Sequence, residues 1–327
     1  MGTTPKTRRT RKRALRARIA RETKRMRKIL ADGKARLDSQ ILRAANDPKL
    51  AVSAARRNKL YRGIRDIYAA MSADGGEWAR RMVTGTAKEA FRNAAKDTDL
   101  AASWDKFSQK HVADYMAAFD PRGVKDLAAI NQLATSDVRW LRKQFVDVFR
   151  EASITGASMR EMSNELKSRI VGPRPDWKFV DKSGRRWKPE NYFTMVTRTT
   201  VATVNREAYL DAGTDAGIEL YEVAGGPPTV APPDPCWDWF GKILSVTGGQ
   251  GYPTIGEAES DGLFHPNCIH YLAAVLPEEV EDAKRREQIV DDNRSDAKQA
   301  ATDREEEQKA RDKAELAAKK KAKKSAA

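Results

Sequence analysis

Apolar residues recur every three or four positions through most of the first half of the chain, which predicts amphipathic helices. The first helical stretch runs from Arg16 to about Met71 and is interrupted near Asn46-Asp47-Pro48. Gly75-Gly76 is expected to separate it from a second helix over 78–95, which is followed by a third over 100–119. The pattern predicts that the buried face of the first stretch consists of Leu37, Ile41, Leu42, Leu50 and Val52.

A turn is predicted at Asp120-Pro121-Arg122-Gly123, before a helix over about 125–152. The apolar side of that helix is Leu127, Ile130, Leu133, Val138, Leu141, Phe145, Val148 and Phe149. Ser158 and Glu161 have the spacing of a capping box, so a short helix should begin there and end near Ile170.

The pattern changes after Gly172-Pro173. Residues 177–187 alternate around Asp181-Lys182-Ser183-Gly184, which predicts a small β-hairpin. A long helix is expected over about 189–216, with Val196, Val201, Val204 and Tyr209 on its apolar side. A strand over 218–223, a loop-rich stretch over 224–263 and an apolar run over 271–276 follow.

These elements predict a mainly α protein with a small α+β module and an elongated helical N-terminal half. The expected organisation is a basic arm over 1–30, flexible or helical, and a helical domain over 31–171. An α+β module over 172–277 and a charged tail over 278–327, helical or disordered, complete it.

Positive charge is concentrated at the start of the chain. The formal net charge is +15, and residues 1–30 hold thirteen Lys and Arg against one acid, Glu22. Such a segment can bind a polyanion, so we expect non-specific contact with double-stranded DNA. The alternatives are a solubilising tail or contact with an acidic protein surface. The residues expected to touch the DNA backbone are Arg8, Arg9, Arg11, Lys12, Arg13, Arg16, Arg18, Arg21, Lys24, Arg25, Arg27 and Lys28.

The charged tail balances fourteen acids with fourteen bases and ends in a second basic patch. Its expected DNA-contacting residues are Lys319, Lys320, Lys321, Lys323 and Lys324. The longest apolar stretches are far too short to span a membrane, so we expect a soluble protein of the cytoplasm before any assembly.

Two of the three histidines flank one of the two cysteines. His265, Cys268 and His270 lie within six residues, and Cys236 precedes them across a Gly- and Pro-rich loop. Thiolate and imidazole are the ligands that zinc prefers, so these four residues are a candidate structural zinc site. The spacing is not that of a standard zinc finger; Asp234 or Asp238 is a further candidate ligand, and a packed loop without metal is the alternative.

An enzyme is the less favoured interpretation. A metal-dependent nuclease needs a metal-bound water and a positioned base, and the run Glu257, Glu259, Asp261 is more typical of a solvated loop. We therefore expect no catalytic residues. Trp237, Trp239 and Phe240 are expected to pack the loop onto the long helix over 189–216, with an exposed platform for stacking bases as the alternative.

Three sequence blocks resemble the phage minor capsid protein 2 family, which belongs with the phage head morphogenesis proteins. The blocks are Cys236 to Ser245, Tyr252 to Ala258, and Asp261 to His270, the last reading Asp-Gly-Leu-Phe-His-Pro-Asn-Cys-Ile-His. The motif positions within and before these blocks are Arg198, Asn205, Gly241, Pro266 and Asn267. Arg198 is expected to pair with Asp181 or Glu207, or to cap backbone carbonyls.

The resemblance implies a low-copy structural protein of the virion head. Such a protein is built into the procapsid near the portal, with roles in assembly and in handling DNA during packaging or ejection. Portal and capsid proteins are its implied partners; a free DNA-binding adaptor is the alternative. Many relatives carry a further cysteine where this chain has Pro233, and arginine where it has Ile269, which weakens a four-ligand metal site.

Overall fold

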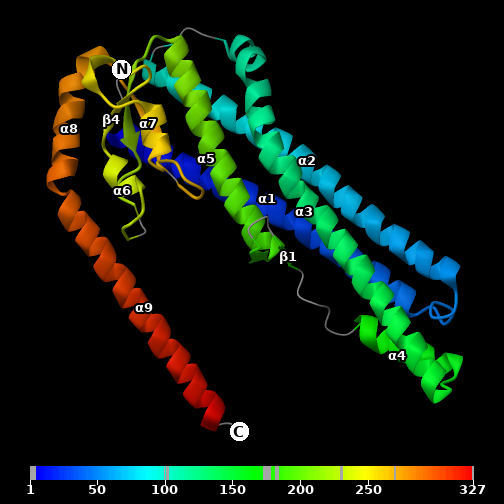
Figure 1. Ribbon diagram of the computed structural model, residues 1–327. Coiled ribbons are helices and arrows are strands. Elements are labelled where there is room, and N and C mark those ends of the chain that lie inside the picture. Colours follow the sequence, from blue (N-terminus) through cyan, green and yellow to red (C-terminus); the bar gives the residue numbers. More distant parts are fainter. Residues whose placement is uncertain are drawn as a thin grey trace. The chain divides into compact units, whose positions relative to one another are not determined.

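Long helices dominate the structure (Figure 1). The computed structural model describes the backbone of residues 5–98, 100, 103–171, 178–180, 184–228, 231–268 and 270–325. Its helices are α1 (Pro5–Ala45), α2 (Ala54–Thr98), α3 (Trp104–Thr155), α4 (Met159–Val171), α5 (Pro189–Asp215), α6 (Cys236–Trp239), α7 (Ile255–Ser260), α8 (Val280–Asp292) and α9 (Arg294–Ser325). The strands are β1 (Phe179–Val180), β2 (Arg186–Trp187), β3 (Leu220–Ala224), β4 (Ile243–Ser245) and β5 (Tyr271–Val275), and two 3₁₀ helices are η1 (Gly249–Gly251) and η2 (Pro277–Glu279). The predicted mainly α fold with a small α+β module is confirmed.

The chain forms two compact units that are interleaved along the sequence. The first unit consists of Met1–Arg16, Thr86–His111 and Val201–Ala327, and the second of Ala17–Gly85 and Val112–Thr200. Helices α1, α2, α3 and α5 each contribute residues to both units.

The second unit is built from side-by-side helices. Gly33 of α1 lies against α2, because a Cβ at this position would meet the sulfur of Met71 at 2.2 Å. Tyr68 of α2 donates a hydrogen bond to Asp137 of α3 at 2.7 Å, and the rings of Tyr61 and Phe145 meet edge to face. Burial of one face of each helix is the main source of their stability, since long isolated helices of this charge content are marginal in water.

The first unit contains a three-stranded antiparallel sheet in the order β4-β3-β5. Leu220 of the central strand pairs with Ser245 on one side and Val275 on the other. Every residue of the three strands is buried, which explains the continuous apolar run over 271–275 rather than an alternating pattern. Leu220, Ile243 and Val275 form a core cluster with Ala283 of α8.

Several local predictions are confirmed. Ser158 and Glu161 form the predicted capping box, with Glu161 N–H donating to Ser158 Oγ at 3.3 Å and Ser158 N–H to the Glu161 carboxylate at 2.7 Å. The hairpin is present as β1 and β2, and the four apolar residues expected on the long helix are buried in α5. The tail is helical, as α8 and α9.

Two predicted helix breaks are wrong. Helix α2 continues through Gly75-Gly76, and α3 continues through Asp120-Pro121-Arg122-Gly123. A helical glycine costs about 1 kcal/mol and an interior proline about 3 kcal/mol relative to alanine. Both helices have buried residues on each side of the interruption, such as Met71 and Trp78 in α2, and burial of these faces outweighs the local cost.

Three residues assigned to buried faces are exposed instead. Leu42, Val52 and Phe149 have exposed fractions of 48%, 39% and 38%. Leu42 and Phe149 each follow a buried residue, Ile41 and Val148, and one position is about 100° around a helix. Val52 lies in the turn between α1 and α2. Among the described residues, no helix is both long enough and apolar enough to cross a bilayer.

Candidate functional site

A tight turn brings His265 and Cys268 together in the first unit. Cys268 N–H donates to the His265 carbonyl at 2.9 Å, which closes a four-residue turn with Pro266 and Asn267 in the middle. Asn267 has a φ of 72°, so the turn is of type II, in which proline fits the first central position and asparagine tolerates the second. The motif positions Pro266 and Asn267 thus shape the backbone that carries the two side chains.

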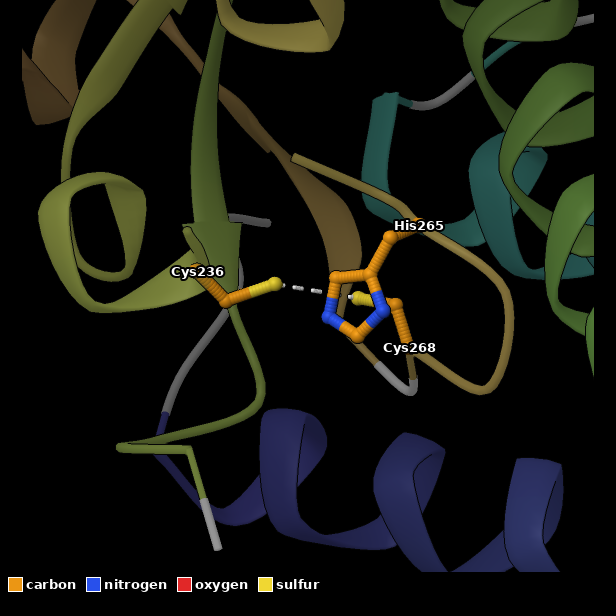
Figure 2. Close-up of side chains that lie close together, drawn as sticks. All are labelled: Cys236, His265 and Cys268. Atoms are coloured by element: carbon orange, nitrogen blue, oxygen red, sulfur yellow. Dashed lines mark hydrogen bonds between the residues drawn. The ribbon is translucent and has the colours of Figure 1, made fainter. Parts of the chain in front are cut away.

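Cys236 reaches the same place from the start of α6. Its sulfur lies 3.5 Å from that of Cys268, and both thiols are buried and unbridged. The potential ligand atoms of Cys236, His265 and Cys268 all lie within 4.8 Å of one another. Figure 2 shows the His265 ring beside the two sulfurs. The structure therefore unites three of the four residues named as a candidate zinc site.

The tautomer of His265 follows from its neighbours. Nδ1 is 2.9 Å from the carbonyl oxygen of Pro266, and because a carbonyl only accepts, Nδ1 carries a proton. The other nitrogen, Nε2, faces the Asp234 carboxylate at 3.4 Å. In a neutral ring Nε2 is a lone pair facing an anion, so this arrangement favours either a metal cation between the two groups or a second proton on the ring, which would make an ion pair.

His270 follows Cys268 by two residues and makes different contacts from His265. Its Nδ1 lies 3.3 Å from the Cys268 sulfur, and its Nε2 lies 2.8 Å from the Gly226 carbonyl oxygen. Gly225 leaves room for the ring, since a Cβ there would stand 3.0 Å from His270 Cδ2. His270 is thus a buried hydrogen-bonding partner of Cys268, held from both nitrogens.

The Cys236 and Cys268 thiols and the His270 imidazole shift one another's pKa values. The hydrogen bond from the Cys236 thiol, followed by that from His270, lowers the pKa of Cys268, although burial acts in the opposite direction. The same sulfur–sulfur hydrogen bond and burial raise the pKa of Cys236. Burial alone would lower the pKa of His270, but the hydrogen bond to Cys268 and its charge, together with the Gly226 carbonyl and Asp234, raise it.

The two aspartates considered as further ligands behave differently. Asp234 is largely buried beside the cluster, and its carboxylate accepts a hydrogen bond from Cys236 N–H at 2.9 Å. Asp238 is exposed and forms an ion pair with Lys298 at 2.8 Å. Asp234 is therefore the carboxylate that lies beside the thiols and the His265 imidazole, whereas Asp238 forms its ion pair with α9.

The remaining motif positions have local structural roles. Gly241 has a φ of 82°, and a Cβ there would lie 2.7 Å from Val290 of α8. Arg198 is exposed on α5, whereas the buried arginine of that helix is Arg206, which contacts Glu207 and Glu259. Asn205 is half-buried on the same helix. The sequence analysis missed Arg206, although its place among buried neighbours at helical spacing was a usable signal.

The aromatic cluster packs against the C-terminal helices and not against α5. Trp237 and Phe240 are buried with Ala301 of α9, and Val290 and Ala297 pack onto them. The expected core role is confirmed for Trp237 and Phe240, whereas Trp239 is half-buried, and the residues packed against the cluster belong to α8 and α9 and not to the predicted α5. Burial also excludes Trp237 as an exposed platform for stacking bases.

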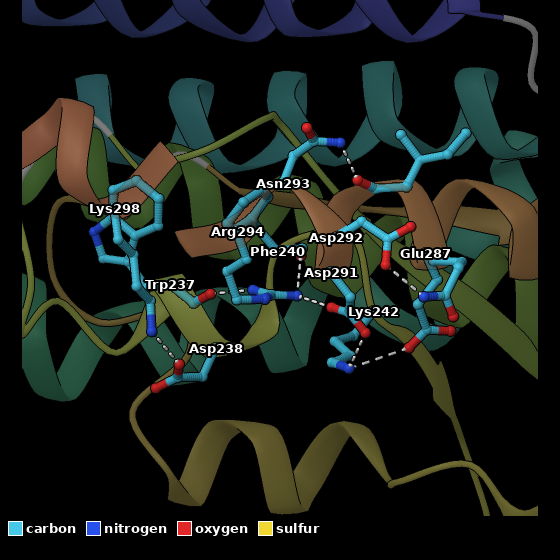
Figure 3. A network of polar contacts seen from close by, with 12 residues as sticks. Trp237, Asp238, Phe240, Lys242, Glu287, Asp291, Asp292, Asn293, Arg294 and Lys298 are labelled. Carbon is cyan, nitrogen blue, oxygen red and sulfur yellow. Dashed lines mark hydrogen bonds and ion pairs between the residues drawn. The ribbon is translucent and has the colours of Figure 1, made fainter. Parts of the chain in front are cut away.

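Arg294 stabilises the contact between the Trp237–Phe240 cluster and the C-terminal helices. The sequence analysis did not identify this residue. Its guanidinium donates to the carbonyl oxygens of Trp237 and, at 3.3 Å, Phe240, and lies 4.8 Å from the centre of the Phe240 ring. Asp291 pairs with Arg294 at 2.5 Å and with Lys242 at 2.8 Å (Figure 3). Burial favours a higher pKa for Asp291, but hydrogen bonds from the two cations lower it.

Arg11 and Lys12, which were expected to contact DNA, are held by partners within the first unit. Arg11 is 8% exposed and forms an ion pair with Asp97. Lys12 is half-buried and donates to the Gly225 carbonyl oxygen; burial, followed by repulsion from Arg16, lowers its pKa. Arg11 is therefore withdrawn from the set of DNA-contacting candidates, because a buried, paired guanidinium cannot reach a phosphate.

Other basic residues of α1 are exposed. In the first unit these are Arg13 and Arg16, and in the second unit Arg21, Lys24, Arg25, Arg27 and Lys28; Arg18 is half-buried. From 21 to 28 every exposed residue is a cation, while Glu22, Thr23 and Met26 are buried. The side chains of Arg8, Arg9, Lys319, Lys320, Lys321, Lys323 and Lys324 lie outside the described residues, as do Asp181 and Ile269.

Comparison with known proteins gives one match. Residues 177–327 match the family model described as Phage minor capsid protein 2. Neither the curated proteins nor the solved structures gave a match. The matched range contains the Cys/His cluster, the sheet and the two C-terminal helices. Residues 177–327, somewhat less than half of the chain, are thus similar to the phage minor capsid protein 2 family, and this similarity supports a structural protein of a bacteriophage capsid.

Proposed function

We propose that this protein is a phage minor capsid protein that contacts packaged DNA through the exposed basic face of α1, defined as Arg21, Lys24, Arg25, Arg27 and Lys28. The contact is to the phosphate backbone and carries no sequence information. In this proposal the protein lies near the portal and assists assembly, packaging or ejection, and it acts without catalysing a reaction. The portal position rests on the family resemblance, whereas the DNA contact rests on the chain's own residues.

The observation that carries the proposal is the separation of charge on α1. Glu22 is the one acid among residues 21–28, and it is buried and paired with Arg25 at 2.8 Å. The exposed face is therefore uniformly cationic over two helical turns. Ordinary solvated helices mix the two signs, whereas neutralising phosphates favours a run of one sign because condensed counterions are released.

The neighbouring helix α2 shows the contrast. Its exposed cations include Lys59, Arg62, Arg65, Arg80 and Arg81, but they are interspersed with exposed Asp66, Asp74 and Glu77. Arg81 pairs with Glu77 at 2.8 Å. Helix α2 thus offers a matched set of five exposed cations on a face of mixed sign.

The test measures the affinity of the full-length protein for duplex DNA at several salt concentrations. One variant replaces the five cations of the basic face with glutamine, and a matched variant replaces the five α2 cations. Each phosphate contact contributes about 0.9 to the slope of log affinity against log salt. We expect the α1 variant to lose about 3 to 4.5 from the slope and the α2 variant to lose less than about 1.

Equal losses in the two variants would mean that net charge alone drives binding, which contradicts a DNA-contacting face on α1. An unchanged slope in the α1 variant would contradict it as well. Replacing Arg25 removes the partner of the buried Glu22, so urea denaturation and circular dichroism of both variants check that each is folded under the binding conditions.

A further inference from the structure

We propose that Cys236, His265, Cys268 and Asp234 form a structural zinc site in the first unit, with His270 as a hydrogen-bonding partner of Cys268 and not a ligand. The site is independent of the DNA-contacting role. Zinc would join the loop before β4 to the loop before β5, two segments whose cysteines are 32 residues apart.

The spacing of the sulfurs fits a shared metal. A tetrahedral zinc with bonds of about 2.3 Å to sulfur holds two thiolates about 3.8 Å apart. The sulfurs of Cys236 and Cys268 are 3.5 Å apart, close to that value and well beyond the ~2.05 Å of a disulfide. The third ligand atom, on His265, lies within 4.8 Å of both.

The orientation of His265 is the second, independent observation. Metal-binding histidines usually donate their other ring N–H to a carbonyl or carboxylate, which fixes the tautomer. Here Nδ1 is satisfied by the Pro266 carbonyl at 2.9 Å, leaving the Nε2 lone pair toward the cluster. The type II turn at Pro266-Asn267 sets this geometry.

Asp234 is assigned as the fourth ligand because its carboxylate faces the same nitrogen of His265. Its oxygen would have to move toward the sulfurs on metal binding, because only Cys236, His265 and Cys268 already have their ligand atoms within 4.8 Å of one another. Asp234 Oδ1 lies 3.4 Å from His265 Nε2, which matches the roughly 3.3 Å between nitrogen and oxygen ligands on a tetrahedral zinc. When His265 is neutral these two groups are both acceptors, and a zinc ion between them replaces the second ring proton that would otherwise join them in an ion pair. His270 differs, because both its nitrogens already have acceptors, the Cys268 sulfur and the Gly226 carbonyl.

A site closed by four protein ligands has a structural role, since catalytic zinc keeps a position open for water. The stretch it would hold, from 224 to 270, contains only short elements and several glycines. A metal cross-link adds stability to such a region because its binding free energy becomes folding free energy.

The first experiment uses the full-length protein, reduced and stripped of metal with a chelator, to which Zn²⁺ alone is added. We expect about one zinc per chain by elemental analysis and a higher melting temperature with zinc. Cobalt(II) in its place should give the absorption of a tetrahedral site with two thiolates. Cys236→Ser and Cys268→Ser should each abolish stoichiometric binding. The proposal would be overturned if the wild-type protein failed to bind zinc. It would also be overturned if both serine variants bound as much zinc as the wild-type protein.

The fourth ligand is tested with a matched pair of carboxylates. Asp234→Asn should weaken zinc affinity at least about tenfold, measured by competition with a chromophoric chelator. Asp238→Asn, an exposed neighbour paired with Lys298, should bind as wild type. His270→Gln should still bind one zinc. If His270→Gln loses the metal while Asp234→Asn retains it, the assignment of Asp234 is overturned; circular dichroism confirms that each variant is folded.

Discussion

Arg11 donates a hydrogen bond to Asp97 at 2.8 Å, although 86 residues separate them and both side chains are buried. Tyr209 donates to the same Asp97 oxygen at 2.8 Å, and the Arg11 guanidinium lies 3.9 Å from the centre of the Tyr209 ring. Arg11 also donates to the Leu272 carbonyl at 3.1 Å. Four segments of the first unit, in α1, α2, α5 and β5, therefore share one polar network.

Removing one partner of this network should destabilise the protein strongly. Arg11→Ala leaves the Asp97 carboxylate buried without its counter-ion, which typically costs about 3–5 kcal/mol. We expect that loss in urea denaturation of the full-length protein. Arg13→Ala, at an exposed position on the same helix, should change stability by less than about 0.5 kcal/mol. Similar, small effects of both substitutions would show that the pair contributes little.

Alkaline pH should weaken the same network through Tyr209. Burial, reinforced by Asp97, raises the pKa of Tyr209 from 10.0 to about 12. The folded-state pKa is the higher one, so the neutral phenol stabilises the fold fully below about pH 10. This contribution is lost as the pH rises to about 12, because the unfolded chain loses its proton first.

The comparison with Tyr209→Phe isolates this effect. At pH 8 we expect wild type to be more stable by about 1–3 kcal/mol, because the phenol donates to Asp97 and accepts from Ala274 N–H at 3.2 Å. The difference should shrink between pH 10 and pH 12 in denaturation curves measured at each pH. A difference that stays constant across this range contradicts the assignment.

Local patterns in the sequence were sufficient for most elements. The capping box at Ser158, the hairpin and the apolar face of α5 depend on residues close in the chain, and the structure has them as predicted. The Cys/His cluster was equally visible, because three of its members lie within six residues. In these cases local preference and burial act in the same direction.

Other features depend on partners that are remote in sequence. No local signal pairs Arg11 with Asp97, or gives Trp237 the C-terminal helices as its partner instead of α5. Pro121 and Gly75-Gly76 have strong local preferences against a helix, and packing of the flanking turns overrides them. The choice between Asp234 and His270 at the cluster likewise needed the positions of the Pro266 and Gly226 carbonyls.

Arg294→Ala should release the C-terminal helices from the aromatic cluster. The substitution leaves the Trp237 and Phe240 carbonyls without their charged donor and Asp291 without one cation. Hydrogen bonds to charged groups contribute about 1.5–3 kcal/mol each. We expect amide hydrogen exchange in α9 to rise about tenfold or more. Arg311→Ala, exposed on the same helix, should leave exchange near Ala301 unchanged; an equal rise in both variants would contradict a specific role for Arg294.

Gly241→Ala tests why the motif needs glycine after Phe240. The residue has a φ of 82°, and an added Cβ would meet Val290 at 2.7 Å. The left-handed backbone costs a residue with a Cβ about 1–2 kcal/mol, and the contact with α8 adds to it, so we expect a loss of about 2–4 kcal/mol in urea denaturation. Val290→Ala in the same chain should recover only part of the contact, because the Cβ of residue 290 would still lie 2.9 Å away, and it should leave the backbone cost. Gly76→Ala is the matched control: no atom lies within 4 Å of its Cβ, and alanine in a helix should stabilise by about 1 kcal/mol. A neutral Gly241→Ala would mean that α8 moves away at no cost, and that this glycine does not set the position of the C-terminal helices.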